Sequence, residues 1–227
     1  MAGRINYYGN IVSNGLIMNL DAAKFDSYPK TGTRWYDITW STSGGTLTNG
    51  PVFNSSNGGY FSFDGTNDLV DMGNLSFNTV TLDLWVNIQT FTGNRAILSK
   101  GSQAIGTGST FAAWIVTATN TVRNRFFNFS GNSGFVSTAN LSANTWYNLT
   151  WTYDNSNIRL YTNSSLTETA ALVGPLINAN NTNLIIASDF YTQSSEMRSS
   201  GFKMYNRALT QAEITQNYNA VKGRFGL

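Results

Sequence analysis

The chain has 227 residues, a formal net charge of +2, and neither cysteine nor histidine. The missing residue types exclude a disulfide framework, a metal site built on cysteine or histidine, and hydrolysis by a Ser-His or Cys-His system. Only 11% of the residues are charged and 14% are aromatic, so Asn, Ser, Thr and Gly must supply most of the surface. Such a composition favours one large β-sandwich over a helical domain.

The basic residues are scattered, and the densest group is Arg123 with Arg125 between aromatic residues. We interpret these two arginines as solvated residues of a strand face and expect no nucleic-acid partner. Residues 1–14 lack a basic patch followed by an apolar run of signal-peptide length, and no window is apolar enough to span a bilayer. We therefore expect neither export by the general pathway nor membrane insertion.

Short segments of alternating polarity, separated by turn residues, predict strands along most of the chain. The expected strands are 15–21, 60–63, 69–72, 80–88, 96–99, 111–117, 121–129, 146–153, 158–161, 184–187 and 201–205. In 80–88, Val80 and every second residue after it are apolar and predict a core face. Trp85 interrupts the polar opposite face, so we expect that face to be covered or curved around something.

The segment 144–163, NTWYNLTWTYDNSNIRLYTN, predicts two aromatic-rich antiparallel strands joined by an Asp-Asn-Ser-Asn turn. Leu149, Trp151 and Tyr153 fall on one face of the first strand, and Trp146 and Asn148 fall on the other. This segment is the strongest hairpin signal in the chain.

One helix is expected at about 210–222. Thr210 and Glu213 have the spacing of a capping box, and Leu209 and Ile214 that of a hydrophobic staple. The stripe expected to dock this helix on the sandwich consists of Ile214, Tyr218 and Val221. Gly223 is the expected stop signal.

The hairpin resembles the W-y-h-v-a-v-t-y-D-g-s…l-Y-v-n-G pattern of laminin G-like and concanavalin A-like lectin/glucanase domains. The matching residues are Trp146, Tyr147, Thr152, Tyr153, Asp154 and Tyr161. Asn148 stands where the family often has His, and Ser164 replaces its turn Gly. The blocks GLIMNLDAAKFDSYPKTGTRWYDIT, GTLTNGPVF, GGYFSFDGTNDLVDMGN and YNRALTQAEI also match, in the family's order.

This resemblance implies an all-β fold, a two-sheet antiparallel jelly-roll sandwich with one short C-terminal helix. The domain would occupy residues 15–227 after an N-terminal arm at 1–14. The end of the chain, 217–226, resembles the N-Y-N-A-x-K-G-R-F-G tail of structural proteins of tailed bacteriophages, particularly marine ones.

Glucanases on this fold hydrolyse β-glucans with carboxylates in an E-x-D-x-x-E arrangement, because one group must protonate the leaving oxygen while another attacks. The chain contains no such triplet, and Asp83 stands alone in its predicted strand. We expect that the protein is not an enzyme.

Calcium is the one cofactor that the sequence leaves open. Related domains hold Ca²⁺ at a sandwich edge through Asp or Asn side chains and carbonyl oxygens. The candidate ligands are Asp64 and Asp68 in FDGTNDLVD, and Asp189 and Glu196 in ASDFYTQSSE. For the first segment we favour ordinary turn chemistry.

The resemblance implies a virion structural or surface protein: a fibre, tail-associated or head-decoration component whose loops recognise a host-surface glycan. Trp114, Phe190 and Tyr191 are the candidate ligand-binding residues, because carbohydrate sites combine aromatic faces with amide and carboxylate groups. The alternative is a secreted or cell-surface bacterial lectin-like carbohydrate-binding module.

The segment 1–14 is too apolar for a freely solvated tail. It either packs along its own sandwich as an edge strand or contacts other copies of the protein or other virion proteins. We expect a homo-oligomer with Tyr7, Tyr8, Ile11 and Phe225 among the contacting residues.

Overall fold

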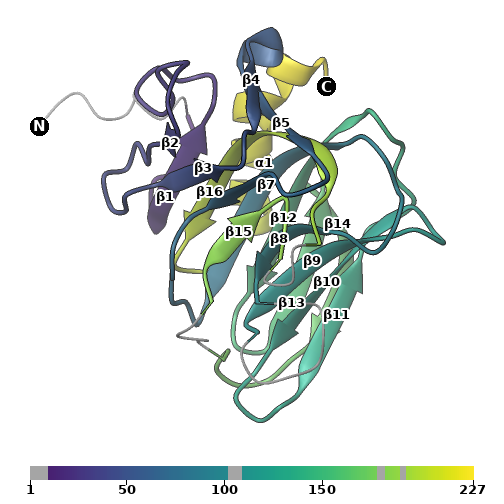
Figure 1. Cartoon of the computed structure of the whole chain (residues 1–227). Coiled ribbons are helices and arrows are strands. Elements are labelled where there is room, and N and C mark those ends of the chain that lie inside the picture. Colours follow the sequence, from purple (N-terminus) through teal and green to yellow (C-terminus); the bar gives the residue numbers. More distant parts are fainter. Residues whose placement is uncertain (1–9, 102–108, 178–181, 190–192) are drawn as a thin grey trace, which may run out of the picture.

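The computed structural model describes residues 10–101, 109–177, 182–189 and 193–227. Over these residues the chain forms two eight-stranded antiparallel sheets packed face to face, with one α-helix near the C-terminus (Figure 1). The jelly-roll sandwich predicted from the sequence is confirmed. None of the helices in the described ranges is long and apolar enough to cross a membrane.

Sheet A has the strand order β14-β13-β12-β7-β16-β5-β4, with β1 also paired to β16. Its strands are β1 (Leu16–Asp21), β4 (Val52–Asn54), β5 (Tyr60–Asp64), β7 (Val80–Ile88), β12 (Trp146–Tyr153), β13 (Asn157–Thr162), β14 (Ser165–Ala171) and β16 (Glu196–Tyr205). The first half of β16 pairs with β5 and the second half with β1. On the other side of β16, its register with β7 shifts between Ser199 and Gly201.

Sheet B has the order β11-β10-β9-β8-β15-β6-β3-β2. Its strands are β2 (Arg34–Trp35), β3 (Gly45–Thr48), β6 (Leu69–Asp71), β8 (Ala96–Lys100), β9 (Phe111–Val116), β10 (Thr121–Phe127), β11 (Ser133–Ser137) and β15 (Leu184–Ile186). The helical elements are η1 (Ser56–Gly58), α1 (Gln211–Val221) and η2 (Lys222–Phe225).

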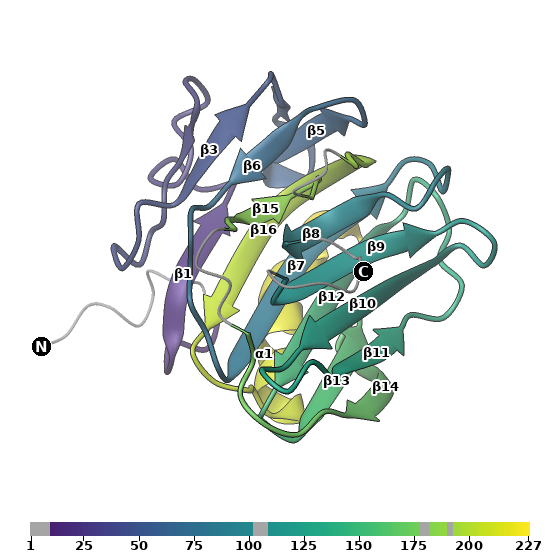
Figure 2. The ribbon, with the colours of Figure 1, turned by 60° about the horizontal axis from the view of Figure 1, so that its bottom comes forward.

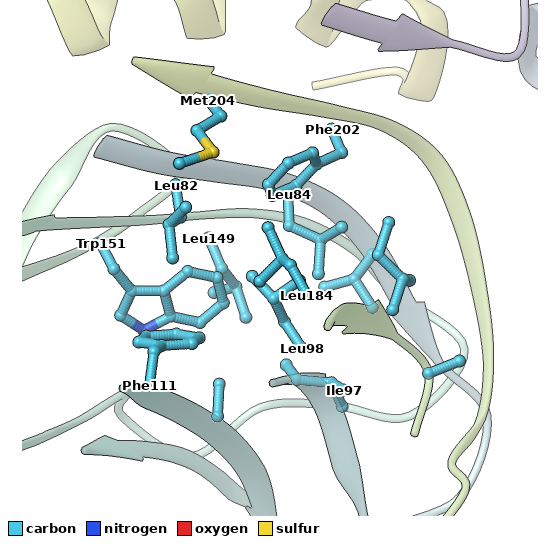
Figure 3. Packing of buried hydrophobic residues seen from close by; sticks show 14 of the residues in the cluster. Leu82, Leu84, Ile97, Leu98, Phe111, Leu149, Trp151, Leu184, Phe202 and Met204 are labelled. Carbon is cyan, nitrogen blue, oxygen red and sulfur yellow. The ribbon is translucent and has the colours of Figure 1, made fainter. Parts of the chain in front are cut away.

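The main core lies between the two sheets. Figure 3 shows Leu82 and Leu84 of sheet A facing Leu98 and Phe111 of sheet B, with Trp151 beside them. The hairpin is confirmed, since β12 and β13 pair from Leu149 to Tyr153.

The outer face of sheet A is covered, as expected from the position of Trp85 on this face. Every residue of β7 is buried, because α1 and η2 lie across this face (Figure 2). Trp85 stacks on Tyr218 of α1, with ring centroids 5.7 Å apart, and on Phe225 of η2, with centroids 4.4 Å apart.

The start of α1 agrees with the sequence. Thr210 is the N-cap and forms a capping box with Glu213, while Leu209 and Ile214 share a second, smaller buried cluster. α1 ends at Val221 with Lys222 as its C-cap, which agrees with the stop expected at Gly223. The chain then continues as a 3-10 turn through Gly223 to Phe225. Gly226, with a left-handed φ of 73°, ends that turn.

Five strands of the described residues were not predicted from the sequence: β2, β3, β4, β11 and β14. β14 is mostly exposed and carries no apolar alternation. β11 contains Gly134, where a Cβ atom would lie 2.6 Å from Ile158 Cδ1. This close approach explains why a glycine, which normally disfavours a strand, occupies this position of β11.

Candidate functional site

Basic and aromatic side chains gather on the outer face of sheet B over β9, β10 and β11. Val122 and Phe126 of β10 point into the core, so Arg123, Arg125 and Phe127 lie on the opposite face. We call this set the arginine–aromatic row; its members are Trp114, Arg123, Arg125, Phe127 and Phe135. Cross-strand pairing aligns Arg123 with Trp114 and Arg125 with Phe135.

Arg125 is held against aromatic rings on two sides. Its guanidinium carbon lies 3.8 Å from the centroid of the Phe135 ring and 5.4 Å from that of Phe127. Burial, and secondarily the positive charge of Arg123, lower the pKa of Arg125 from its ordinary value.

Arg123 is exposed, and its guanidinium carbon lies 6.0 Å from the Phe135 ring centroid. Its Nε donates a hydrogen bond to Ser137 Oγ at 3.3 Å. Among the described residues, no carboxylate lies within ion-pair distance of Arg123. The Arg123 guanidinium is therefore available to an anion from solution.

Phe135 is 37% exposed, so part of its ring is free to contact a ligand. An aromatic ring beside guanidinium groups can pack against the apolar face of a sugar while the arginines bind a carboxylate or sulfate. The row is thus suited to an acidic carbohydrate.

The predicted ligand-binding residues are only partly placed. Trp114 belongs to the row but is 7% exposed, and it packs edge-on against Phe135 with centroids 6.4 Å apart. It therefore supports the exposed members more than it presents a face of its own. Phe190 and Tyr191 lie outside the described residues.

From the sequence, Arg123 and Arg125 are expected only as solvated residues of a strand face, and Phe135 is not among the expected ligand-binding residues. The alternation of Arg123, Arg125 and Phe127 along one strand was visible in the sequence. The contribution of Phe135 was not, because β11 was not predicted.

Trp40 is a second exposed aromatic residue that the sequence did not single out. It is 78% exposed and has a left-handed φ of 61°, which is rare for a bulky residue. The buried carboxylate of Asp37 fixes its loop by accepting hydrogen bonds from the backbone N–H groups of Asn19, Thr39 and Thr42.

Three of the four candidate calcium ligands, Asp64, Asp68 and Glu196, lie near the same turn. Asp64 of β5 lies opposite Glu196 of β16, and the Asp64 N–H donates to Asp68 Oδ2. Hydrogen bonding to the Thr66 backbone lowers the pKa of Asp64, whereas burial raises that of Asp68. Asp189 is buried, and its Oδ1 accepts a hydrogen bond from the Gln193 N–H.

Two carbonyl oxygens near this turn are already bound by a cation of the protein. Arg95 Nη1 donates to Gly65 O at 3.1 Å and to Ser194 O at 2.9 Å. Across the described ranges, no three His, Cys, Asp or Glu side chains are grouped as ligands of a metal ion. The turn chemistry favoured for 64–68 agrees with these contacts.

Two of the predicted assembly residues are placed. Ile11 is buried against its own domain, and Phe225 stacks on Trp85 and makes a tilted ring contact with Trp146. Tyr7 and Tyr8 lie outside the described residues. The expected contacts with other copies stay a prediction.

Comparison with known proteins identifies the fold. The family model described as the concanavalin A-like lectin/glucanases superfamily, Laminin_G_3, matches residues 56–215. The botulinum neurotoxin type G receptor-binding domain matches with a TM-score of 0.66 and 18% identity, over 91% of this chain and 51% of that one. No curated protein matches the chain in sequence.

Two further similar structures are complexes with a sugar. The ligand-binding domain of botulinum neurotoxin serotype D in complex with N-acetylneuraminic acid has a TM-score of 0.70 and 11% identity, over 90% of this chain and 50% of that chain. Trypanosoma rangeli sialidase in complex with sialic acid has a TM-score of 0.68 and 14% identity, over 90% of this chain and 32% of that chain. This chain spans about half the length of the neurotoxin domains, and these identities show the fold alone.

Proposed function

We propose that this chain, which belongs to the concanavalin A-like lectin/glucanase superfamily, is a non-catalytic carbohydrate-binding protein of a virion surface. In this proposal it is a fibre, tail-associated or head-decoration component, and its ligand is an acidic glycan of the host surface. The ligand binds the arginine–aromatic row on sheet B.

One observation carries the choice of ligand: the Arg125 guanidinium lies 3.8 Å from the Phe135 ring centroid, and the exposed Arg123 guanidinium is nearby on the same face. An arginine packed on a ring has a restricted orientation, so less conformational entropy is lost when it binds a carboxylate. Two neighbouring positive charges favour a polyanion over a neutral sugar.

The absence of catalysis is supported by the sequence, which lacks the E-x-D-x-x-E triplet of the glucanases.

The virion location is supported by the resemblance of residues 217–226 to the end of phage structural proteins. Neighbouring capsid, portal and tail genes would favour this location over the alternative, a secreted or cell-surface bacterial lectin-like module. Neighbouring glycoside hydrolase genes would contradict it.

The ligand proposal is tested by comparing the binding of a uronate-containing polysaccharide with that of a neutral polysaccharide of similar length. We expect Arg123→Gln and Phe135→Ala each to weaken binding of the acidic polymer about tenfold or more. The matched control is Lys30→Gln, which removes an exposed positive charge from a distant loop.

Equal binding of both polymers, or acidic binding that survives both substitutions, would contradict the proposed ligand site. Loss of binding in Trp40→Ala alone would move the site to the Asp37–Thr42 loop and overturn the role of the row.

A further inference from the structure

A cavity of about 250 Å³ lies on the other side of the molecule, between the outer face of sheet A and the end of the C-terminal helix. β1 and β16 provide Asn19, Asp21 and Lys203, whereas Ala220 and Arg224 approach from α1 and η2. Figure 2 shows β1 beside β16, with the yellow C-terminal helix behind sheet A. The exposed residue Lys24 also lines the cavity, which therefore reaches the surface.

A row of buried polar residues crosses sheet A at this level. Strand pairing places Asn19 of β1 beside Lys203 of β16, Lys203 beside Asp83 of β7, and Asp83 beside Thr150 of β12. Asp83 accepts hydrogen bonds from Asn148 Nδ2 at 3.2 Å and from Thr150 Oγ1 at 3.3 Å. The acidic member of the row is therefore well provided with donors.

Lys203 and Asn19, the two members of the row that line the cavity, have too few hydrogen-bond partners. Lys203 is 5% exposed, and in the described part of the chain its ammonium makes one long hydrogen bond, 3.4 Å to Asp83 Oδ1. Asn19 is 4% exposed, and its Oδ1 has no hydrogen-bond partner among the described residues. A buried ammonium with spare donors beside a buried unpaired acceptor costs folding free energy unless something binds both.

Arg224 does not meet this need, because its guanidinium is engaged elsewhere. Nη1 donates to Asp21 Oδ1 at 2.8 Å, and Nη2 donates to Ser200 Oγ at 2.6 Å. Asp21 is thereby paired with Arg224, and the Lys203 ammonium is paired with Asp83, so the exposed rim residue Lys24 gives the cavity its remaining positive charge.

We propose that this cavity binds one small hydroxylated carboxylate of the sugar-acid class. Its carboxylate accepts hydrogen bonds from Lys203, and one of its hydroxyl groups donates to Asn19 Oδ1. The volume is just below the range of about 300–1,000 Å³ of drug-sized ligand sites, so it suits a single ring and not an oligosaccharide. This site is separate from the arginine–aromatic row and does not depend on it.

The test is calorimetric titration of the full chain with glucuronate, with glucose and acetate as comparison ligands. We expect saturable binding of glucuronate at one site, and at least about tenfold weaker binding of glucose, which cannot pair with Lys203. Acetate should also bind more weakly, because it has no hydroxyl group for Asn19.

Two variants locate the binding. Asn19→Ala removes the unpaired acceptor, and Ala220→Trp fills the cavity from the exposed surface of α1 without touching the buried polar row. Each should weaken glucuronate binding about tenfold or more, and a thermal melt of each variant verifies that it is folded.

Lys30→Gln is the matched control, since it removes an exposed positive charge that does not line the cavity, and it should leave glucuronate binding unchanged. No saturable glucuronate binding, equal binding of glucose, or binding that survives both cavity variants would overturn the proposal. Loss of glucuronate binding in Arg123→Gln alone would place the acid on sheet B and would also overturn it.

Discussion

Phe225, almost the last residue of the chain, stacks on Trp85 in the middle of sheet A, with ring centroids 4.4 Å apart and an interplanar angle of 22°. Its ring also lies 4.5 Å from that of Trp146 on β12. Beside it, Arg224 ties η2 to Asp21 of β1. The end of the chain is therefore part of the sandwich, because it covers a face of β7 that would otherwise expose Trp85.

Phe225→Ala should lower the free energy of unfolding by about 2 kcal/mol, somewhat less than for a fully buried phenylalanine because this side chain is partly exposed. Urea denaturation followed by tryptophan fluorescence measures the loss. The control is Phe129→Ala, since Phe129 is 65% exposed and should change stability by less than about 0.5 kcal/mol. Equal effects of the two substitutions would show that η2 does not stabilise the sheet.

We expect the Arg207–Glu213 ion pair to make the protein less stable in acid. The hydrogen bonds that Glu213 accepts from Arg207 lower the pKa of Glu213 from 4.5 to about 2. A lowered pKa means that the contribution is complete above pH 4.5 and disappears as the pH falls toward 2. The Glu213 side chain is 25% exposed, so we expect a contribution on the order of 2 kcal/mol.

The measurement is the difference in unfolding free energy between the wild type and Glu213→Gln as a function of pH. This difference should be constant near neutral pH and should shrink toward pH 2. A difference that does not change with pH would show that the ion pair contributes nothing to acid sensitivity.

Two fully buried asparagines should respond in opposite directions to the same substitution. Both polar side-chain atoms of Asn124 lack a hydrogen-bond partner within the described ranges, whereas Asn148 Nδ2 donates to Asp83 Oδ1. Asn124→Leu should therefore stabilise the protein by about 1 kcal/mol, and Asn148→Leu should destabilise it by about 2 kcal/mol or more. Chemical denaturation of both variants provides the comparison; destabilisation by Asn124→Leu would reveal a partner for that amide.

The N-terminal segment contains two parts with different expected roles. Val12 N donates to Asn217 Oδ1, Asn217 Nδ2 donates to Tyr205 Oη, and Tyr205 Oη donates to Val12 O. Deletion of 1–14 opens this buried hydrogen-bonded triangle, so it should lower stability. Deletion of 1–9 keeps the triangle and should leave the melting temperature unchanged while it abolishes self-association through Tyr7 and Tyr8.

Light scattering after size-exclusion chromatography measures assembly, and thermal melts measure stability. A 1–9 deletion that assembles like the wild type would contradict the assembly role of this segment.

The sequence predicted the parts of the fold in which local pattern and burial agree. The alternation from Val80 to Ile88 and the hairpin turn at 154–157 are strong local signals, and Thr210 with Glu213 specifies the helix start. β14 was not predicted, because an exposed edge strand has no apolar period.

The candidate sites were less predictable, because they depend on pairings between distant residues. Arg125 and Phe135 become neighbours only through the register of β10 with β11. Asn19 and Lys203 are 184 positions apart and meet only because β1 joins the second half of β16. Residue types alone cannot reveal such pairs.

Amide chemical-shift mapping tests the proposed glycan site. The ¹⁵N-labelled protein is titrated with an oligogalacturonate, and the shifted amides are assigned. We predict that the shifts concentrate on β10 and β11, around Arg123, Arg125 and Phe135, and that Arg123→Gln removes them. Shifts confined to other surfaces, or no shifts at saturating oligosaccharide, would contradict binding at the arginine–aromatic row.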